Sequence, residues 1–291
     1  DVTVTAKLDD NFIHIAGGGT TSFDIEGLTV VASDQDGDST TAAVKVVVTD
    51  DVPTVTGLPA SAATVAEDAA DIGGNWSLDE GADGVADADL VVEVNVGGGD
   101  TTYTMAQALA GIIVTNTDGN LGVLTVDAAG TWSFDPALDI DNSDGVADVV
   151  NFTIKATDAD GDIASDSHTI NLTDGSGPGD EQGETAGITL AVDESSMNSD
   201  STPAISFTAG SDDLTSFVFG DAALMTVNTD AIAGADVTWL RVSDTKIEGR
   251  VDGDLALTLT LSAPASIAAE TSADVTVTAK LDDNFIHIAG G

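Results

Sequence analysis

The sequence contains the same strand, acidic loop, strand unit twice, at a constant offset of 124 residues. Alternating apolar residues precede and follow both loops, and this alternation is the period of a β-strand. Each loop places three aspartates at alternate positions around one glycine: Asp34, Asp36 and Asp38 in the first copy, and Asp158, Asp160 and Asp162 in the second. The repetition predicts at least two related β modules, each ending in an acidic exit, at Asp50 and Asp174.

Three carboxylates at such short spacing repel one another unless a cation neutralises them. Hard oxygen ligands in a glycine-kinked loop suit Ca²⁺, which takes six to eight oxygens at ~2.3–2.6 Å. The loop is not an EF-hand, because its glycine is fourth rather than sixth and its twelfth residue is Lys45 or Thr169 rather than glutamate. A solvated acidic turn is the alternative interpretation, and the second copy at an equivalent point favours calcium.

The charge balance excludes several classes of protein. Acidic residues number 51 against 7 basic ones, for a formal net charge of −44. This excludes a nucleic-acid binder that works through basic patches and argues against docking on anionic lipid. Because 42% of the residues are hydrophobic and the acids are interleaved with them, the composition indicates a folded β protein rather than a disordered chain. A halophilic protein would show a similar balance.

The absence of cysteine makes bound metal a candidate source of rigidity. The chain has no cysteine, so neither disulfides nor thiolate metal sites are available. Metal binding can supply folding energy in their place. No apolar run approaches the ~18 residues of a membrane helix, and no signal peptide is visible. We therefore expect no insertion into a membrane.

The two ends of the chain carry one identical stretch. Residues 1–18 and 274–291 match without a change, at an offset of 273 residues. This predicts a longer parent protein built from tandem 273-residue repeats. We expect residues 1–52 to be the C-terminal part of one β-sandwich, 53–178 a complete sandwich and 179–291 the N-terminal part of the next. Whether the two partial segments complete one sandwich within a chain or between chains stays open.

Short strands separated by turn signals predict sandwich modules throughout. In the first segment the predicted strands are residues 2–6, 11–16, 23–32 and 43–49. In the second they are 90–96, 112–115, 122–126, 131–134 and 149–156, with a partly helical stretch at 101–109. In the third they are 204–208, 216–219, 235–242, 246–251, 255–261 and 274–280.

Three stretches carry a family resemblance: GTWSF at 130–134, VVNFTIKATDADGD at 149–162 and LAVDES at 190–195. They resemble the VCBS and bacterial cadherin-like repeats of giant RTX-type adhesins exported by type I secretion. The resemblance implies tandem immunoglobulin-like or cadherin-like β-sandwiches, Ca²⁺ at domain junctions, an extracellular place on the cell surface, and a role in adhesion or biofilm formation. The residues it implies as metal ligands are Asp34, Asp36, Asp38, Asp50, Asp51, Glu67, Asp68, Asp158, Asp160, Asp162, Asp174, Asp193 and Glu194.

Catalysis finds little support in the sequence. The histidines are His14, His168 and His287, and there is no GxSxG elbow, phosphate loop or HExxH motif. We expect no catalytic residue and no cofactor besides Ca²⁺, and we expect His168, which replaces Val44 of the other copy, at the edge of a sandwich core.

The favoured function is a structural extender, because near-identical repeats set the length of a protein. The expected partners are then the neighbouring repeats of the same chain. The alternatives are a Ca²⁺-dependent module that binds a carbohydrate or surface, and a subunit that self-assembles laterally into a fibril or surface layer.

Overall fold

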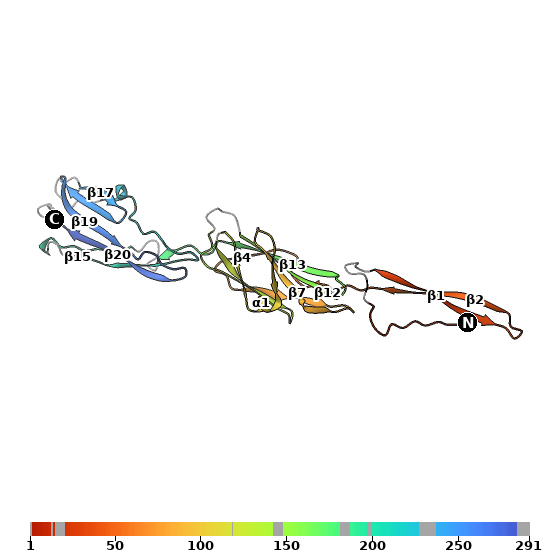
Figure 1. The fold of residues 1–291 in the computed structure, drawn as a ribbon. Coiled ribbons are helices and arrows are strands. Elements are labelled where there is room, and N and C mark those ends of the chain that lie inside the picture. The colour runs from red at the N-terminus through yellow and green to blue at the C-terminus, as the bar shows by residue number, and fades with distance from the viewer. Residues whose placement is uncertain are drawn as a thin grey trace. The chain divides into compact units, whose positions relative to one another are not determined.

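The structure is a computed structural model that describes residues 2–12, 14, 21–117, 119–141, 148–180, 187–196, 200–226 and 237–283. It divides into two compact units, Asp1–Thr173 and Asp174–Gly291, whose elements Figure 1 labels. Nearly all of the regular structure is β-strand in antiparallel sheets, which confirms the all-β prediction. The described residues include no helix that is long and apolar enough to cross a membrane. The division into three segments stays a prediction.

The first unit begins with a two-stranded hairpin of β1 (Ser22–Ser33) and β2 (Ser39–Thr49). Leu28 lies opposite Val44, and the register shifts between Ile25 and Leu28. Gly27 sits in this bulge with a φ of +87°, a left-handed conformation that glycine adopts without steric cost. The first acidic loop joins the two strands.

The rest of the first unit is a sandwich of two sheets (Figure 1). One sheet contains, in spatial order, β5 (Ile72–Asn75), β11 (Thr131–Pro136), β10 (Asn120–Asp127) and β9 (Ile112–Thr115). The other contains β4 (Ala63–Ala66), β13 (Ile163–Thr173), β12 (Asp148–Asp158), β7 (Val85–Asn95) and β8 (Thr101–Thr104). The short pair β3 (Thr54–Thr56) and β6 (Ser77–Asp79) and the helix α1 (Met105–Leu109) complete the module.

The sandwich core forms because apolar residues alternate along the facing strands. Phe152 and Ile154 on β12 and Ile170 on β13 are fully buried. The Trp132 ring of the opposite sheet lies 5.2 Å from the rings of both Phe152 and His168. His168 is buried, and its Nδ1 lies 2.8 Å from the carbonyl oxygen of Pro59. His168 is therefore part of the sandwich core, where the sequence predicted a position at the edge of that core.

The second unit contains one seven-stranded sheet among its described residues. Its main path is β14 (Gly179–Asp180), β16 (Ala204–Thr208), β20 (Ser272–Leu281), β19 (Asp254–Ser262), β18 (Lys246–Val251) and β17 (Val237–Ser243), and β15 (Asp200–Ser201) also pairs with β20. Two single-turn helices, η1 (Glu194–Ser196) and η2 (Ala222–Leu224), lie outside the sheet.

Two predicted strands are wrong. Residues 2–6 belong to no strand and are exposed, because no described strand lies beside them. Residues 216–219 are also outside any strand, since the only ladder contact nearby is the isolated bridge between Leu214 and Ile267. The predictions at 11–16 and 235–242 lie partly outside the described residues. The other predicted strands coincide with observed strands to within a few residues, and the helical stretch at 101–109 contains α1.

Candidate metal centre

The loop between β12 and β13 is folded by the side chain of its first aspartate. Asp158 Oδ1 accepts hydrogen bonds from the backbone N–H groups of Gly161, at 3.0 Å, and Asp162, at 2.7 Å. The Asp158 N–H in turn donates to the Asp162 carbonyl at 3.0 Å. Gly161 has a φ of +97°, which residues with a Cβ rarely adopt. The sequence therefore turns the three carboxylates of this loop toward one another.

The three carboxylates of this loop are buried. Asp158, Asp160 and Asp162 are only 6%, 3% and 4% exposed, and each offers an oxygen within 4.8 Å of those of the other two. Apart from the neighbouring Asp158 carboxyl, the carboxylate oxygens of Asp160 have no hydrogen-bond partner in the described structure. A buried charge without donors is strongly unfavourable. Asp160 thus needs either a proton or a bound cation.

Two further aspartates extend the cluster from other parts of the chain. Asp50, which follows β2, and Asp83, in the turn before β7, each place an oxygen within 4.8 Å of Asp160. Asp50 is buried, and its Oδ2 has no hydrogen-bond partner in the described structure. His14 Nδ1 lies 3.6 Å from that oxygen, beyond hydrogen-bond distance. The exit of the hairpin and the loop of the sandwich therefore share one acidic centre.

When no cation is present, the electrostatics of this centre favour the protonated form of its carboxyl groups. A hydrogen bond shared with the Asp158 carboxyl, burial and the neighbouring carboxylates raise the pKa of Asp160 to about 6. Such a bond exists only when one of the two carboxyls is protonated, which agrees with the absence of any other donor. Burial also raises the pKa of Asp50, and the nearby His14 opposes this effect.

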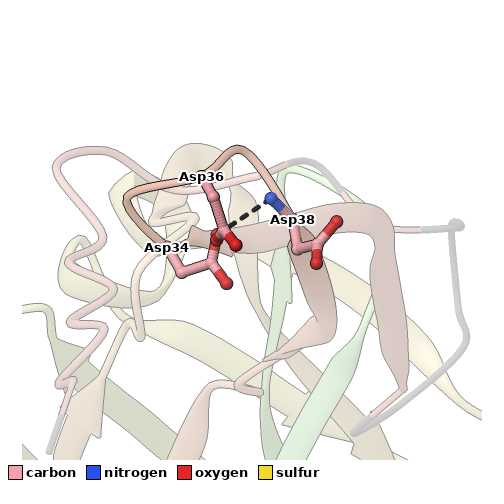
Figure 2. A group of neighbouring side chains, drawn as sticks. All are labelled: Asp34, Asp36 and Asp38. Carbon is pink, nitrogen blue, oxygen red and sulfur yellow. Dashed lines mark hydrogen bonds between the residues drawn. The ribbon is translucent and has the colours of Figure 1, made fainter.

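The first acidic loop has the same backbone but lies in solvent. Asp34 Oδ1 accepts from the N–H groups of Gly37, at 3.1 Å, and Asp38, at 2.9 Å; Figure 2 shows the bond from Asp38. Gly37 has a φ of +98°, nearly that of its counterpart in the second loop. Asp34, Asp36 and Asp38 bring their oxygens within 4.8 Å, but all three are exposed. The carboxyl of Asp36 and the two backbone donors lower the pKa of Asp34.

Three other predicted ligands accept hydrogen bonds from backbone N–H groups. Glu67 is buried, and its Oε2 accepts from the Ile140 N–H at 2.7 Å. Asp51 Oδ2 accepts from the Ala82 N–H at 2.9 Å. Asp193 Oδ1 accepts from the Ser195 N–H at 2.8 Å, which also lowers the pKa of Asp193.

The remaining predicted ligands lie in turns or short helices. Asp68 is half-buried in the turn after β4, Asp174 is exposed after β13, and Glu194 begins η1. The role of these acids as metal ligands stays a prediction.

The sequence reasoning missed Asp83. This residue lies in the turn GADG at 81–84, and the turn is acidic and glycine-rich. It has no twin at the 124-residue offset, so the repetition that singled out the other loops does not identify it. Gly81 in the same turn has a φ of +69°, and a Cβ there would lie 2.8 Å from Asp51 Oδ2. The signal that could have identified Asp83 is the acidic, glycine-rich composition of its turn, because this turn is not repeated.

The ligand chemistry of the buried cluster fits a hard cation. Five carboxylates from Asp50, Asp83, Asp158, Asp160 and Asp162 gather there, and oxygen is the ligand that Ca²⁺ prefers. Zn²⁺ prefers nitrogen and sulfur, and the only ring nitrogen described beside the cluster is that of His14. Mg²⁺ keeps several waters in a strict octahedron. A dense group of flexible carboxylates therefore suits Ca²⁺ better.

Comparisons with known proteins give a similarity in structure but none in sequence. No protein-family profile matches the chain, and no curated protein sequence matches it. Among solved structures, the chain is similar to a Ca²⁺-stabilised adhesin that helps an Antarctic bacterium reach out and bind ice, with 19% sequence identity and a TM-score of 0.24. The match covers 90% of this chain and 56% of that protein. At this TM-score the similarity carries no argument about function.

Proposed function

We propose that this chain is an extender segment of a bacterial cell-surface adhesin, in which Ca²⁺ stiffens the junction between the β1–β2 hairpin and the following sandwich. One observation carries the proposal: Asp160 is buried, lacks any hydrogen-bond donor besides the Asp158 carboxyl in the described structure, and lies among four other carboxylates. Five carboxylates in one cluster repel one another, so a cation or protons must compensate their charge.

The position of the cluster explains how an ion would act on stiffness. Asp50 follows β2 directly, and the loop carrying Asp160 joins β12 to β13. Between Asp50 and β3 the chain has only three residues, 51–53. Bound Ca²⁺ supplies positive charge to carboxylates from both sides of this short linker. Asp158 keeps the loop in shape through its backbone bonds, and Asp50 and Asp160 contribute oxygens that have no donors in the described structure other than the Asp158 carboxyl.

Stiffness is what a spacer of this composition needs. The reach of a flexible linker grows only as the square root of its length, whereas that of a rigid rod grows in proportion to length. Each calcium ion would also cancel two units of the −44 net charge and so reduce self-repulsion. The tandem repetition at 273 residues supports a role in setting length. We propose that the segment is extracellular, non-catalytic and partnered by neighbouring repeats.

The test is thermal unfolding and small-angle X-ray scattering of the chain in Ca²⁺, in Mg²⁺ and in chelator. We expect Ca²⁺, and not Mg²⁺, to raise the unfolding temperature. We also expect Ca²⁺ to narrow the distribution of particle dimensions, because the hairpin and the sandwich then move as one body. A calcium-indifferent melting curve and scattering profile would contradict the proposal and leave the carboxylates as a solvated acidic shell.

A further inference from the structure

Two adjoining hollows lie beside β7 in the sandwich of the first unit. Their volumes are about 370 Å³ and 330 Å³, and Asp87, Leu90 and Ala128 line both of them. They therefore form one continuous groove, which we call the β7 groove. Its lining residues all fall within 76–130, so the first unit builds this groove on its own.

A bulge in β7 opens the groove. The ladder between β12 and β7 shifts register between Ala156 and Asp158, and residues 86–89 of β7 have no partners on β12. The pairing of β7 with β8 runs over residues 91–94, so β8 does not cover this stretch. Bulges redirect side chains, and this one carries the exposed Asp87 out of the ladder and to the groove.

The groove has an apolar floor. Trp76 and Leu90 are buried, and the Trp76 Nε1–H donates to the Asp127 carbonyl oxygen at 3.2 Å, which holds the indole in place. Leu109 of α1 also lines the groove and is 56% exposed. The half-buried apolar side chains of the lining that pack against the core are Leu78, Val85 and Met105. A ligand with an apolar body would therefore remove apolar surface from water here.

In the described structure, three carboxylates line the groove without a cationic partner. They belong to Glu80 in the first hollow, Asp127 in the second and Asp87 in both. No lysine or arginine is among the described lining residues. The ion pairs in the described part of the first unit involve other acids, namely Asp9, Asp24, Asp50 and Glu93. The groove thus combines an apolar floor with negative charge, and an amphipathic cation complements both.

The order of these groups selects the ligand. Asp87 lies where the two hollows join, and each hollow adds a carboxylate of its own, so charge and apolar surface alternate along the groove. A metal ion would leave the apolar floor in water, and a neutral alkyl chain would leave the carboxylates unpaired. We propose that the β7 groove binds a linear aliphatic polyamine, whose ammonium groups are separated by runs of methylenes. The methylenes lie on Leu90 and Leu109, and the ammonium groups pair with the carboxylates.

Recognition of this kind needs both features of the groove. Each hollow has a volume within the range of roughly 300–1,000 Å³ that is typical of small-molecule sites. Exposed ion pairs contribute little individually, so charge alone does not hold a polyamine at one place on an acidic protein. The apolar floor supplies the selectivity, because it favours a cation that carries a hydrocarbon chain.

The variants for the test are at exposed positions, each with a matched control. Asp87→Asn removes the central charge, and Asp135→Asn makes the same change at an exposed position of β11 outside the groove lining. Leu109→Asn makes the floor polar, and Ile113→Asn is its control at a position 65% exposed outside the lining. None of these residues belongs to the acidic centre around Asp160, so the outcome is independent of calcium binding there.

The measurement is isothermal titration calorimetry of the full chain with spermidine, at physiological salt and in excess Ca²⁺, because these ions compete for the other acids of a chain with a net charge of −44. We expect one saturable site per chain. Asp87→Asn should weaken binding about threefold to fivefold, as expected for the loss of one exposed ion pair. Leu109→Asn should weaken it as well, and both controls should bind as the wild type does.

A second cation separates the groove from net charge. Hexaamminecobalt(III) has the same charge as spermidine and no methylenes, so it should bind about tenfold more weakly. Equal affinity for the two cations, equal losses in Asp87→Asn and Asp135→Asn, or the absence of a saturable spermidine site would each overturn the proposal. Tighter binding of a trilysine peptide than of spermidine would also overturn it, and would assign the groove to a protein partner. Should Leu109→Asn fail to fold, the comparison of Asp87→Asn with Asp135→Asn decides alone.

Discussion

Replacing Asp160 by asparagine should make the chain more stable than the wild type in chelator and less stable than the wild type in calcium. Asp160 is the one residue shared by both acidic trios of the buried cluster, Asp158–Asp160–Asp162 and Asp50–Asp83–Asp160. In chelator at neutral pH its charge is unfavourable in the native state, because its pKa is raised to about 6. Asparagine removes that charge and adds two N–H donors among carboxylates. The variant should therefore unfold at a higher temperature than the wild type in chelator.

In calcium the order should reverse. At a hundredfold excess of free Ca²⁺ over the dissociation constant, binding stabilises the wild type by about 2.7 kcal/mol, or about 10 °C for a domain of this size. Loss of the shared ligand breaks both trios. If affinity falls about a hundredfold, the same calcium concentration stabilises the variant by only about 0.4 kcal/mol.

The assay is thermal unfolding monitored by tryptophan fluorescence, since Trp76 and Trp132 are buried in the sandwich that carries the Asp160 loop. Asp135→Asn, at an exposed position of β11, makes the same change of charge away from the site and should respond to calcium as the wild type does. Equal calcium shifts in the wild type and Asp160→Asn would refute the reasoning, as would a variant that is less stable than the wild type in both conditions.

Two further outcomes follow from the same loop. In chelator, the free energy of unfolding should fall as pH rises from about 4 to about 6. The reason is that Asp160 keeps its proton in the native state up to about pH 6, while the unfolded chain releases it near ~3.9. Urea titrations across this range should show this decrease in the wild type and a smaller decrease in Asp160→Asn. Gly161→Ala should destabilise the sandwich by about 1–2 kcal/mol, since φ there is +97°, whereas Gly98→Ala, in open space without a positive φ, should be nearly neutral in the same denaturation experiment.

The acidic loops were predictable because their structure is local. The hydrogen bonds from Gly161 and Asp162 to the Asp158 carboxylate span three and four residues. Such short-range bonds depend on the sequence of the loop alone, so two similar sequences produce two nearly identical backbones. The strand alternation on both sides is local as well. Sequence was therefore sufficient for the hairpins, their loops and the all-β class.

The composition of the buried centre was not predictable in this way. Asp83 joins it only because the turn before β7 lies beside the loop after β12, and this proximity is a property of the folded sheet. The Glu67 carboxylate accepts from the Ile140 N–H, 73 residues away in the chain, and no local pattern predicts this bond. Burial also separates the two loops, since the same three aspartates are buried in one and exposed in the other. Long-range packing decides each of these points.

Neighbouring strands decide even whether a favourable sequence becomes a strand. Residues 2–10 and 275–283 are identical, but Val2 is 79% exposed outside any strand and Val275 is 1% exposed in β20. The second copy pairs with β16 and β19, and the described structure offers the first copy no such neighbours. Isolated strands are marginal in water, because their backbone and apolar face are satisfied only by pairing and packing. The difference in exposure between Leu28, at 49%, and the fully buried Phe152 has the same origin. In this chain the alternating pattern shows which segments can form buried strands, and a partner strand or sheet is needed for them to do so.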